Sequence, residues 1–544
     1  MAQEVGEGVE RGELLQRPLP PRTEPEKARV VRLVLGDQLV HDHPWWQRVD
    51  PDVLCVLMEV RQETDYARHH IQKVLGFFGA MRRFAEHLRT EGHRVHYLTL
   101  DDPANQQDIG LNLQAIIRHC GASELGYLLP DEHRLDEQLK RFATTSVVAV
   151  QVADTHHFLT ERHELAALFK GKKQYLMERF YRLMRERTGL LMDRGAPLGG
   201  RWNFDHDNRQ RPPKDHVPPP PLLFDQDLRE LEAMVRSAGV HTIGSVDAAH
   251  FPWPLDRAES LDLLRYFIAH LLPHFGTYQD AMTPHHWALY HARLSFSLNV
   301  KLLSPLEVCQ AAVDAHLADP QRIALAQVEG FVRQIIGWRE YMRGIYWAQM
   351  PRYAERNFFG HDRTLPQWFW TGRTRMACLR DAITGSLANA YAHHIQRLMV
   401  TGNFALLAGV HPDEVDAWYL GIYIDAIEWV EITNTRGMSQ FADGGIVGTK
   451  PYVSSGAYLH KMGHYCGTCH YNVNDRTGPR ACPFNALYWH FLARNRDRFL
   501  SEEARPGMMV RLGMPYRTWD KMPAATRQAL LDKGEDLLKH IEEL

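Results

Sequence analysis

Three cysteines near the C-terminal end of the sequence have the spacing of a metal centre. Cys466 and Cys469 stand three residues apart around Gly467, which favours a tight turn, and Cys482-Pro483 follows after twelve residues. Two thiolates on one turn and a third from a distance can bind an iron–sulfur cluster, and proline after the last ligand is common in such sites. Zinc also accepts four thiolates, so the spacing alone leaves zinc open.

The centre needs a fourth ligand, which must come from the four other cysteines. Cys378 is our choice, because it follows Trp370-Thr-Gly-Arg373 in a helical region, whereas the remaining three lie in apolar runs typical of a core: Cys55, Cys120 and Cys309. An odd number of cysteines also favours metal or redox chemistry over a disulfide framework. The alternative is that the thiols are buried core residues whose spacing is a coincidence.

A second set of residues could hold a planar redox cofactor. Charged and aromatic side chains share short helical stretches of an otherwise apolar region, at 338–341, 391–399 and 425–431. Arg397 and Asp425 would each be costly to bury alone and are tolerable as a pair. Such a pair beside a flavin-like ring can stabilise a negative charge on that ring. Taken singly, each of these residues is more typical of an ordinary core ion pair or a packed histidine.

The N-terminal part of the chain has the pattern of an α/β domain. Short β-branched runs alternate with helical stretches at 66–89 and 112–120, and the runs cover 30–35, 53–58, 95–100, 125–129 and 147–150. This pattern predicts a parallel five-stranded, doubly wound sheet covered on both faces. Ligands of such sheets lie beyond the carboxyl ends of the strands, where Asp37, Gln38 and Glu59 stand. Only Gly36-Asp-Gln38 follows the first strand, so a glycine-rich dinucleotide fingerprint is missing.

Helical patterns replace the strands beyond Pro221, and they cover 225–238, 258–270, 305–317, 323–350, 374–400, 414–433 and 524–543. We therefore expect a flexible leader (1–28), an α/β domain (29–160), an interdomain linker (161–240) and a large all-helical domain that includes the cysteine region (241–544). The segment 170–214 carries 12 Lys and Arg against 5 Asp and Glu, with Arg179, Arg182 and Arg185 at helical spacing. It is either a solvated linker helix or an arm that contacts phosphates.

Composition narrows the class of protein. A chain of 544 residues is too long for one hydrophobic core, and 44% apolar with 24% charged residues exclude a mostly disordered or fibrous protein. The sequence lacks a run of 18 apolar residues and a secretory signal, so we expect a cytoplasmic protein without a membrane span. With a net charge of −3, any binding of nucleic acid depends on a local basic face.

In this order, the motifs resemble the photolyase and cryptochrome family, and most closely its bacterial iron–sulfur branch of (6-4) photolyases and bacterial cryptochromes. The resemblance covers nearly the whole chain from Val30 onward. It rests on an ordered series of motifs: Leu35-Gly-Asp-Gln-Leu39, the helix 175–184, Gly200-Arg-Trp-Asn203, Trp338-Arg-Glu-Tyr341, His393-His394, Asn434-Thr-Arg-Gly-Met-Ser-Gln-Phe-Ala-Asp-Gly444 and the four cysteines.

The resemblance implies three cofactors. A U-shaped FAD would lie in the helical domain, with contacts among Tyr278, His291, Ser295, Arg339, His394, Arg397, Asp425 and Glu431. A [4Fe-4S] cluster, mainly structural in role, would be bound by Cys378, Cys466, Cys469 and Cys482. A 6,7-dimethyl-8-ribityllumazine antenna would lie in the α/β domain near Asp37, Gln38, Met58, Glu59, Tyr66 and Lys73. Electrons would reach the photoexcited flavin through Trp370, Trp418 and Tyr419, unlike the tryptophan triad of other branches.

The implied function is light-driven repair of (6-4) photoproducts in UV-damaged DNA by a monomer associated with the bacterial nucleoid. Photoexcited reduced FAD would donate the electron, and His394, supported by His393, would donate the proton, because the pKa of histidine, about 6.5, lies near working pH. Tyr452 and Tyr458 would contact the lesion or the backbone, and Lys450 and Lys461 would neutralise phosphates. Alternatively, both histidines only pack against the flavin.

Two other functions are compatible with the same resemblance. The main one is a blue-light photoreceptor of cryptochrome type, which would keep the flavin and signal through a protein partner. Repair of cyclobutane dimers is the other, and we favour it less because the histidine pair of this branch serves the (6-4) chemistry. The retained His393-His394 favours (6-4) repair over both.

Overall fold

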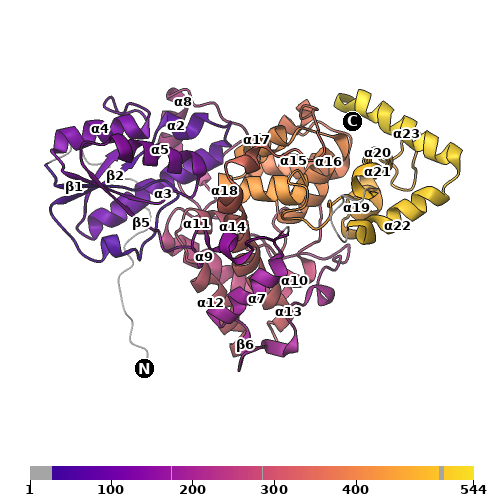
Figure 1. Ribbon diagram of the computed structural model, residues 1–544, viewed down its shortest axis with the longest axis horizontal. Coiled ribbons are helices and arrows are strands. Elements are labelled where there is room, and N and C mark those ends of the chain that lie inside the picture. The colour runs from indigo at the N-terminus through magenta and orange to yellow at the C-terminus, as the bar shows by residue number, and fades with distance from the viewer. Residues whose placement is uncertain (1–26, 173, 285, 501–507) are drawn as a thin grey trace.

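The structure is a computed structural model that describes residues 27–172, 174–284, 286–500 and 508–544, so the expected leader lies almost wholly outside the described residues. An α/β lobe, a helical lobe and a group of C-terminal helices follow one another along the longest axis (Figure 1). Among the described residues, no helix combines the length and apolar character that a membrane span requires.

All five expected strands are present and form one parallel sheet in the order β3-β2-β1-β4-β5. Their bounds are β1 (Val30–Leu33), β2 (Val53–Met58), β3 (Arg94–Leu98), β4 (Glu124–Leu128) and β5 (Ala149–Ala153). The central strand β1 pairs through Val30 with Val53 of β2 on one side and with Glu124 of β4 on the other. The winding direction therefore reverses between β1 and β4, which is where ligands of doubly wound sheets bind.

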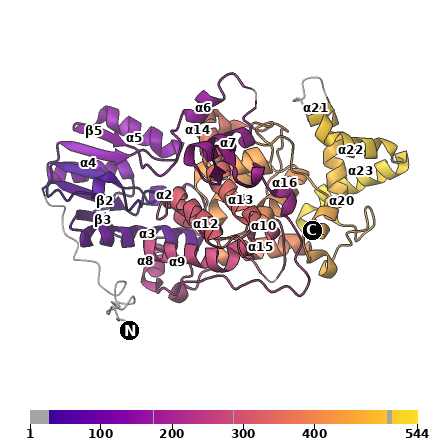
Figure 2. The same cartoon turned by 90° about the horizontal axis from the view of Figure 1, so that it is seen from below.

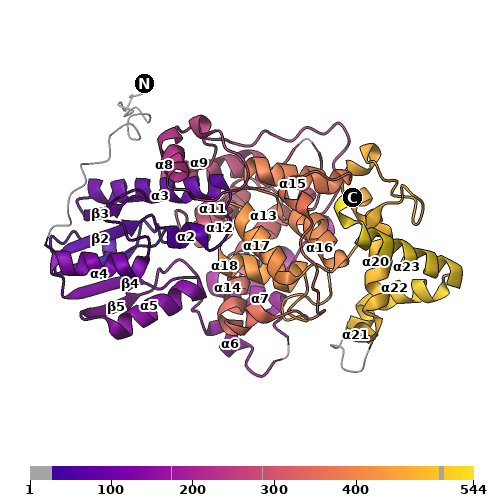
Figure 3. The same cartoon turned by 90° about the horizontal axis from the view of Figure 1, so that it is seen from above.

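Alternate side chains of β2 pack on opposite faces of the sheet. Val53, Cys55 and Leu57 belong to the core under α3 (Ile71–Thr90) and α8 (Arg229–Ser237), whereas Leu54, Val56 and Met58 belong to the core under α4 (Ile109–Cys120) and α5 (His133–Thr145). Figure 3 shows the two pairs of helices on the two sides of the sheet. The predicted double cover is confirmed.

In the rest of the described chain the regular elements are helices, apart from the two-residue strands β6 (Met192–Asp193) and β7 (Ala196–Pro197), and Figure 2 shows these helices from a second side. The α-helices are α2 (Arg61–Asp65), α6 (Glu164–Leu168), α7 (Met177–Thr188), α9 (Arg257–Tyr266), α10 (Phe275–Tyr278), α11 (Ser295–Asn299), α12 (Pro305–Ala318), α13 (Leu325–Val332), α14 (Glu340–Gln349), α15 (Ala377–Asn389), α16 (Asn403–Ala408), α17 (Pro412–Ile422), α18 (Glu428–Ile432), α19 (Gly456–Met462), α20 (Pro483–Arg494), α21 (Arg496–Leu500), α22 (Met508–Lys521) and α23 (Ala524–Lys539). Short 3-10 turns and four π-helical segments join them, of which η7 (Arg333–Arg339), η10 (Gln396–Gly402) and η11 (Thr433–Ser439) bear on the site.

Two long helices expected from the sequence are broken, and the breaks carry the candidate site. The pattern 374–400 is interrupted between α15 and η10, where Ala390 adopts a left-handed φ of 50°, and the pattern 414–433 is interrupted between α17 and α18. The two breaks pair with each other, because the Ile424 N–H donates to the Ala390 carbonyl oxygen at 2.9 Å. The side chain of Gln72 in α3 also donates to the Ala388 carbonyl oxygen, at 2.6 Å. These tertiary hydrogen bonds replace the helical ones.

The interpretation of 170–214 as a solvated linker helix is wrong. Helix α7 packs on η7, and its Phe180, Tyr181 and Met184 are buried in the largest core of the molecule. Arg185 is fully buried as well, where it donates to carbonyl oxygens of the chain that follows the helix. Arg182 instead points outward and pairs with Glu178. The arginines of α7 therefore do not form one phosphate-binding face, and Lys173 of this segment lies outside the described residues.

Candidate active site

Arg397 and Asp425 form the ion pair that the sequence predicts. The guanidinium donates twice to the carboxylate, with both N–O distances at 3.0 Å. Asp425 also accepts a hydrogen bond from the Ser295 hydroxyl at 2.6 Å, and its backbone oxygen accepts one from Asn299 at 2.7 Å. The Arg397 side chain keeps 23% of its surface exposed. The two helix breaks and α11 thus fix a charged pair that remains open on one side.

Three histidines lie beside this pair. The rings of His291 and His393 are stacked, with centroids 4.6 Å apart and planes 6° apart. Buried ring nitrogens of both, Nε2 of His291 and Nδ1 of His393, have no hydrogen-bond partner within the described residues. A polar atom that is buried without a partner costs free energy. The stacked rings of His291 and His393 therefore suit a ligand that supplies hydrogen bonds to them.

His394 is the most exposed of the three histidines. Surrounding protein and the positive charge of Arg397 lower its pKa to about 4. The same two causes, with His394 itself, lower the pKa of His291 to about 3. Both rings are therefore neutral at pH 7 in the ligand-free protein. An imidazolium would form here only when a negative charge is brought close to the ring.

The structure gathers Ser295, His291, His394, Arg397 and Asp425 into one group. Arg339, buried between Phe158 and Trp429, contacts Asn299 of this centre at 3.4 Å. Among the described residues, no hydrogen bond or ring contact joins the other two expected cofactor contacts to the group. The ring of Tyr278 stacks on Tyr290 with centroids 5.4 Å apart, and Glu431 is buried in α18, where it accepts a hydrogen bond from the Thr435 hydroxyl.

An aromatic row leads from the interior to the ion pair. The buried Trp418 makes ring contacts with Tyr419 at 5.3 Å and with Tyr423 at 5.9 Å. The guanidinium of Arg397 lies 3.7 Å from the centre of the Tyr423 ring. Trp370 is not among the residues whose rings contact Trp418 in the described chain; its ring faces Arg68 instead. Sequence reasoning missed Tyr423, which stands at the start of the second helix break.

The four predicted cysteine ligands line one small cavity of about 20 Å³, although they come from two distant parts of the sequence. Cys378 lies in α15, and the other three lie between α19 and α20. The Ala377 N–H points at Cys469 Sγ at 3.4 Å. A Cβ at Gly456 would approach Cys482 Sγ to 2.9 Å, so only glycine leaves this space free. As they stand, no three His, Cys, Asp or Glu side chains of the described residues could hold a metal ion.

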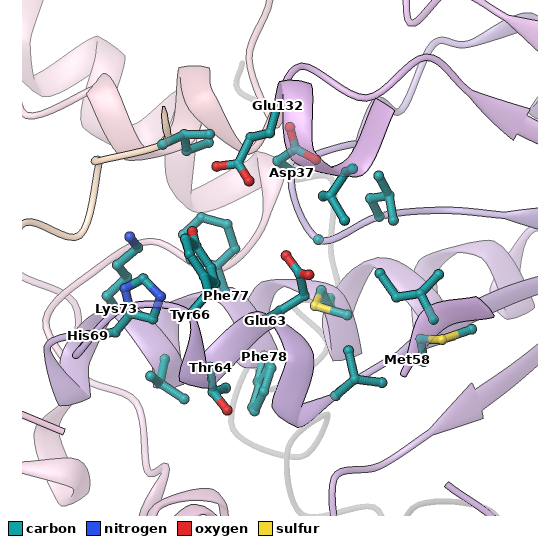
Figure 4. A pocket seen from close by; sticks show the side chains of 18 of the residues that line it. Asp37, Met58, Glu63, Thr64, Tyr66, His69, Lys73, Phe77, Phe78 and Glu132 are labelled. Atoms are coloured by element: carbon teal, nitrogen blue, oxygen red, sulfur yellow. The ribbon is translucent and has the colours of Figure 1, made fainter. Parts of the chain in front are cut away.

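A larger cavity of about 100 Å³ lies at the carboxyl ends of the sheet, on the reversal between β1 and β4 (Figure 4). Four of the six expected antenna residues line it: Asp37, Met58, Tyr66 and Lys73. The other two, Gln38 and Glu59, are absent from its lining. Gln38 donates to the Leu128 carbonyl oxygen at 3.1 Å, and Glu59 is held by Arg82 and by Tyr97, each at 2.7 Å. Both therefore brace the strand ends.

Sequence reasoning missed several polar residues of this cavity. Glu63, His69, Asp131 and Glu132 also line it, and Figure 4 shows Glu63 and Glu132 approaching it from different elements. Asp131 and Glu132 follow the end of β4 after Leu129 and Pro130, so the rule that pointed to Asp37 could have found them too. Burial lowers the pKa of Lys73 to about 8 against the opposing charge of Glu132. The inner wall is formed by Ala426 and Ile427, which come directly after Asp425.

Of the residues expected to face DNA, Tyr458 is connected to His394 through Arg209, whose charge acts on both. Tyr452 and Tyr458 are partly buried, and Lys450 and Lys461 are exposed. Burial and the charge of Asp280 raise the pKa of Tyr458 to about 12, and Asp280 pairs with Arg209 at 3.2 Å. Arg209 also contributes to lowering the pKa of His394. Beside it, Arg211 donates to His464 at 3.0 Å. The sequence analysis counted Arg209 and Arg211 in the basic segment 170–214, but it did not predict their contacts with Asp280 and His464.

Comparison with known proteins decides the family. The family model for deoxyribodipyrimidine photo-lyase-related proteins matches residues 32–251. A (6-4) photolyase from Agrobacterium fabrum (strain C58 / ATCC 33970) is 44% identical over 513 residues, which are 94% of this chain and 99% of that relative. The chain belongs to the (6-4) photolyase family.

Solved structures of photolyases and cryptochromes share the fold. A bacterial class III photolyase from Agrobacterium tumefaciens matches with a TM-score of 0.51 at 16% identity, over 80% of this chain and 83% of that one. A cryptochrome from Synechocystis sp. PCC6803 matches with a TM-score of 0.50 at 14% identity, over 77% and 83%. At these identities the two structures support the photolyase architecture of an α/β domain followed by a helical domain, and nothing finer.

Proposed function

We propose that the protein is a light-driven DNA repair enzyme, a (6-4) photolyase that splits pyrimidine–pyrimidone (6-4) photoproducts. One observation carries the proposal: the residues that such chemistry needs, an open Arg397–Asp425 pair and an accessible His394, stand together in a chain that aligns over nearly its whole length with a (6-4) photolyase. Repair of this lesion needs an electron and a proton delivered at one place, and no binding role alone would require both.

The site fits FAD. Arg397 would hold the charged edge of the ring, with Asp425 and Ser295 fixing the guanidinium, and the unpartnered nitrogens of His291 and His393 would receive hydrogen bonds or donate them. Tyr278, Arg339 and Glu431 would complete the pocket. When bound, FAD supplies the light-driven electron. The buried row Trp418–Tyr419–Tyr423 would carry electrons to the Arg397–Asp425 pair. The partly exposed Trp370 would supply them to Trp418 without a direct ring contact among the described residues.

His394 would hold and deliver the proton. The ring is neutral in the free protein because surrounding protein and Arg397 disfavour its charged form. DNA phosphates and the lesion bring negative charge, which raises the pKa of a nearby histidine. The proton donor would therefore be made ready by substrate binding, with His393 holding the ring position through its stack on His291.

The lesion would reach His394 from the face that carries the basic residues. Arg209 and Arg211 approach from the segment between α7 and α8, and the exposed Lys450 and Lys461 would add to this face. Such side chains position the DNA through its phosphates without reading its sequence. Flipping a damaged dinucleotide out of the stack costs less than flipping a sound one, because damage has already weakened stacking. Tyr452 and Tyr458 would contact the flipped lesion or the adjoining backbone.

Four thiols that line one cavity support a [4Fe-4S] cluster at this site. Thiolates are the ligands of such clusters, and the turn Cys466-Gly-Thr-Cys469 and the proline after Cys482 are common features of their sites. Zinc accepts the same four thiolates, so iron and zinc analysis decides between the two. Bound by Cys378, Cys466, Cys469 and Cys482, the cluster would tie α15 to the segment before α20.

The cavity in the α/β lobe suits a lumazine antenna. Its walls are apolar, with Met58 and Phe77 for a flat ring, and four carboxyl groups lie among its lining residues. Carboxylates accept hydrogen bonds from hydroxyl groups such as those of a ribityl chain. Lys73 and Tyr66 add donors at the inner end, so we propose this cavity as the site of 6,7-dimethyl-8-ribityllumazine.

Illumination of defined substrates tests the function. The flavin-loaded, reduced protein is mixed with oligonucleotides that carry either a (6-4) photoproduct or a cyclobutane dimer, and the products are separated by chromatography. We expect restored pyrimidines from the (6-4) substrate under blue light and none in the dark. Conversion of the dimer alone would indicate the other repair activity. Normal flavin photochemistry without conversion of either lesion would indicate a photoreceptor.

Asp425→Asn should weaken FAD binding by about 10- to 100-fold, since removing one partner of a buried ion pair costs several kcal/mol and this pair is partly open. Arg397 would lose its orienting carboxylate, and the Ser295 hydroxyl would lose a charged acceptor. FAD retained after gel filtration at fixed free flavin measures the effect. The matched control is Asp520→Asn, which breaks a similar bidentate pair with Arg496 away from the site. Equal FAD retention in both variants would contradict this role of Asp425.

A further inference from the structure

A lysine of the helical lobe holds two carboxyl groups at the edge of the α/β-lobe cavity. Lys301 lies just after α11, and its side chain is only 1% exposed. Its Nζ atom lies 3.1 Å from Asp37 Oδ2 and 2.9 Å from Asp131 Oδ2. Asp37 and Asp131 stand beyond the ends of β1 and β4 and line the cavity, whereas Lys301 is not among its lining residues. The ammonium group therefore fixes both carboxyl groups from behind the cavity wall.

Arg134 of α5 holds two further carboxyl groups of this wall in the same way. Its guanidinium donates to both oxygens of Glu63, at 2.8 and 2.9 Å, and to Glu132 at 2.9 Å. Glu63 and Glu132 line the cavity, and Arg134 does not. Because Asp131 and Glu132 are consecutive, the two sets join into one chain of four carboxyl groups. Figure 4 shows three of them, Asp37, Glu63 and Glu132, at the cavity.

The cavity wall offers little positive charge to a ligand. The two cations behind it are occupied by the four carboxyl groups. Among the described residues, Lys73 is the only lysine or arginine that lines the cavity, and its ammonium group already donates to the Leu420 carbonyl oxygen at 2.9 Å. The wall is thus rich in hydrogen-bond acceptors and poor in groups that bind an anion. A neutral ligand with several hydroxyl groups can donate to such a wall.

A buried histidine adds a polar group that is available to a ligand. His69 is 3% exposed and lines the cavity, and its Nδ1 atom has no hydrogen-bond partner among the residues that the structure describes. Its ring contacts that of Tyr66, with centroids 5.0 Å apart. A buried ring nitrogen without a partner costs free energy, so this wall favours a ligand whose ring has a polar edge. The cavity therefore suits a polar ring as well as hydroxyl groups.

We propose that this cavity selects a neutral, hydroxyl-bearing chromophore and excludes the phosphate ester of the same compound, because four carboxyl groups line its wall. The inference rests on the proposed antenna site and adds the chemical class that the site accepts. A phosphate would replace a hydroxyl group of the chain that these carboxyl groups bind, and bringing like charges together among buried side chains is costly. Lys301 and Arg134 act as positioning residues, since they hold the carboxyl groups without lining the cavity.

Binding of a matched pair of ligands tests the selectivity. The probes are 6,7-dimethyl-8-ribityllumazine and its 5′-phosphate, which share one fluorescent ring. Each is titrated into the full-length, FAD-containing protein after gel filtration has removed any bound lumazine. We expect a Kd about 100-fold higher for the phosphate, because like charges that meet in a binding site weaken binding by at least this factor.

Removal of carboxylate charge separates selectivity from structural damage. In the double variant Glu63→Gln, Glu132→Gln, amide oxygens still accept hydrogen bonds, so the affinity for lumazine should fall by only about 10-fold. Arg134, freed of its two carboxylates, can then bind the phosphate, and the ratio of the two Kd values should fall below about 10. Damage to the fold alone would weaken both ligands equally. The matched control is Glu137→Gln, which removes an exposed α5 carboxylate that pairs with Lys140 outside the cavity lining.

Two results would overturn the proposal: a wild-type protein that binds both probes with similar Kd values, and a double variant that keeps the wild-type ratio. If the double variant does not fold, the comparison on the wild-type protein decides alone. Failure of the proposed functions is distinguishable from both results. A protein that binds neither probe loses the antenna assignment together with this inference, and one that selects lumazine but repairs neither lesion loses only the repair assignment.

Discussion

His394→Ala should lower repair of (6-4) photoproducts by about 100- to 10,000-fold, the range that a positioned proton donor contributes. The variant should keep its flavin, because the Arg397–Asp425 pair and the His291–His393 stack do not depend on the His394 ring. It should also keep light-driven flavin reduction, since Trp418 contacts Tyr419, and Tyr419 bonds the Arg397 carbonyl oxygen, without involving the His394 ring. Bound FAD and repair yield are measured on the same sample.

The alternative for His394 gives a different pattern. If the ring only packs against the flavin, FAD would be partly lost and repair would fall in proportion to the empty fraction. His394→Gln serves as the matched variant, because it keeps a polar side chain that cannot deliver a proton, and it should fail like His394→Ala. Full repair by a flavin-loaded His394→Ala protein would end the assignment of His394 as the proton donor.

Cys378→Ser should remove nearly all iron from the protein and lower its stability. Cys378 is the ligand that comes from α15, so without it the proposed cluster could no longer tie this helix to the segment before α20. A covalent cross-link between segments far apart in sequence contributes about 2–5 kcal/mol, and we expect a loss of that size in the free energy of unfolding. Iron and sulfide analysis after anaerobic purification, together with thermal unfolding, measures both effects.

Cys309→Ser is the matched control for the cluster. Cys309 is a fully buried thiol of α12, away from the four-cysteine cavity, so its variant should keep its iron. A wild-type protein that carries stoichiometric zinc and no iron would refute the iron–sulfur assignment, whatever the variants do.

The sheet was predictable because its signals are local. Val53–Met58 is an unbroken apolar run, and such a run in a strand has one physical solution, which is a layer covered on both faces. The Arg397–Asp425 pair was predictable for a similar reason, since two lone charges in an apolar region have few ways to be tolerated. In both cases burial restricts which types of residue are tolerated, and this restriction can be seen in the sequence.

The helix breaks were not predictable, because nothing in their sequence requires them. Ala390 is a good helix former, and neither break contains glycine or proline. Contacts from α3 and between the breaks themselves impose the irregular backbone, and tertiary contacts of that kind leave no local signal. The position of Gln38 and Glu59 outside the cavity lining was unpredictable for the same reason, since polar residues at strand ends can bind a ligand or brace the strands, and only their partners decide.

The hydrogen bond between Ile424 and Ala390 makes the two broken helices mechanically interdependent. One break carries His393 and His394, and the other carries Asp425 and the inner wall of the α/β-lobe cavity. A shift or local unfolding of one loop breaks its hydrogen bond to the other loop. The two loops should therefore open together, as one cooperative unit of the native state. His394 and Asp425, 31 positions apart in the sequence, therefore belong to one structural unit, and substitutions that loosen either loop should affect both.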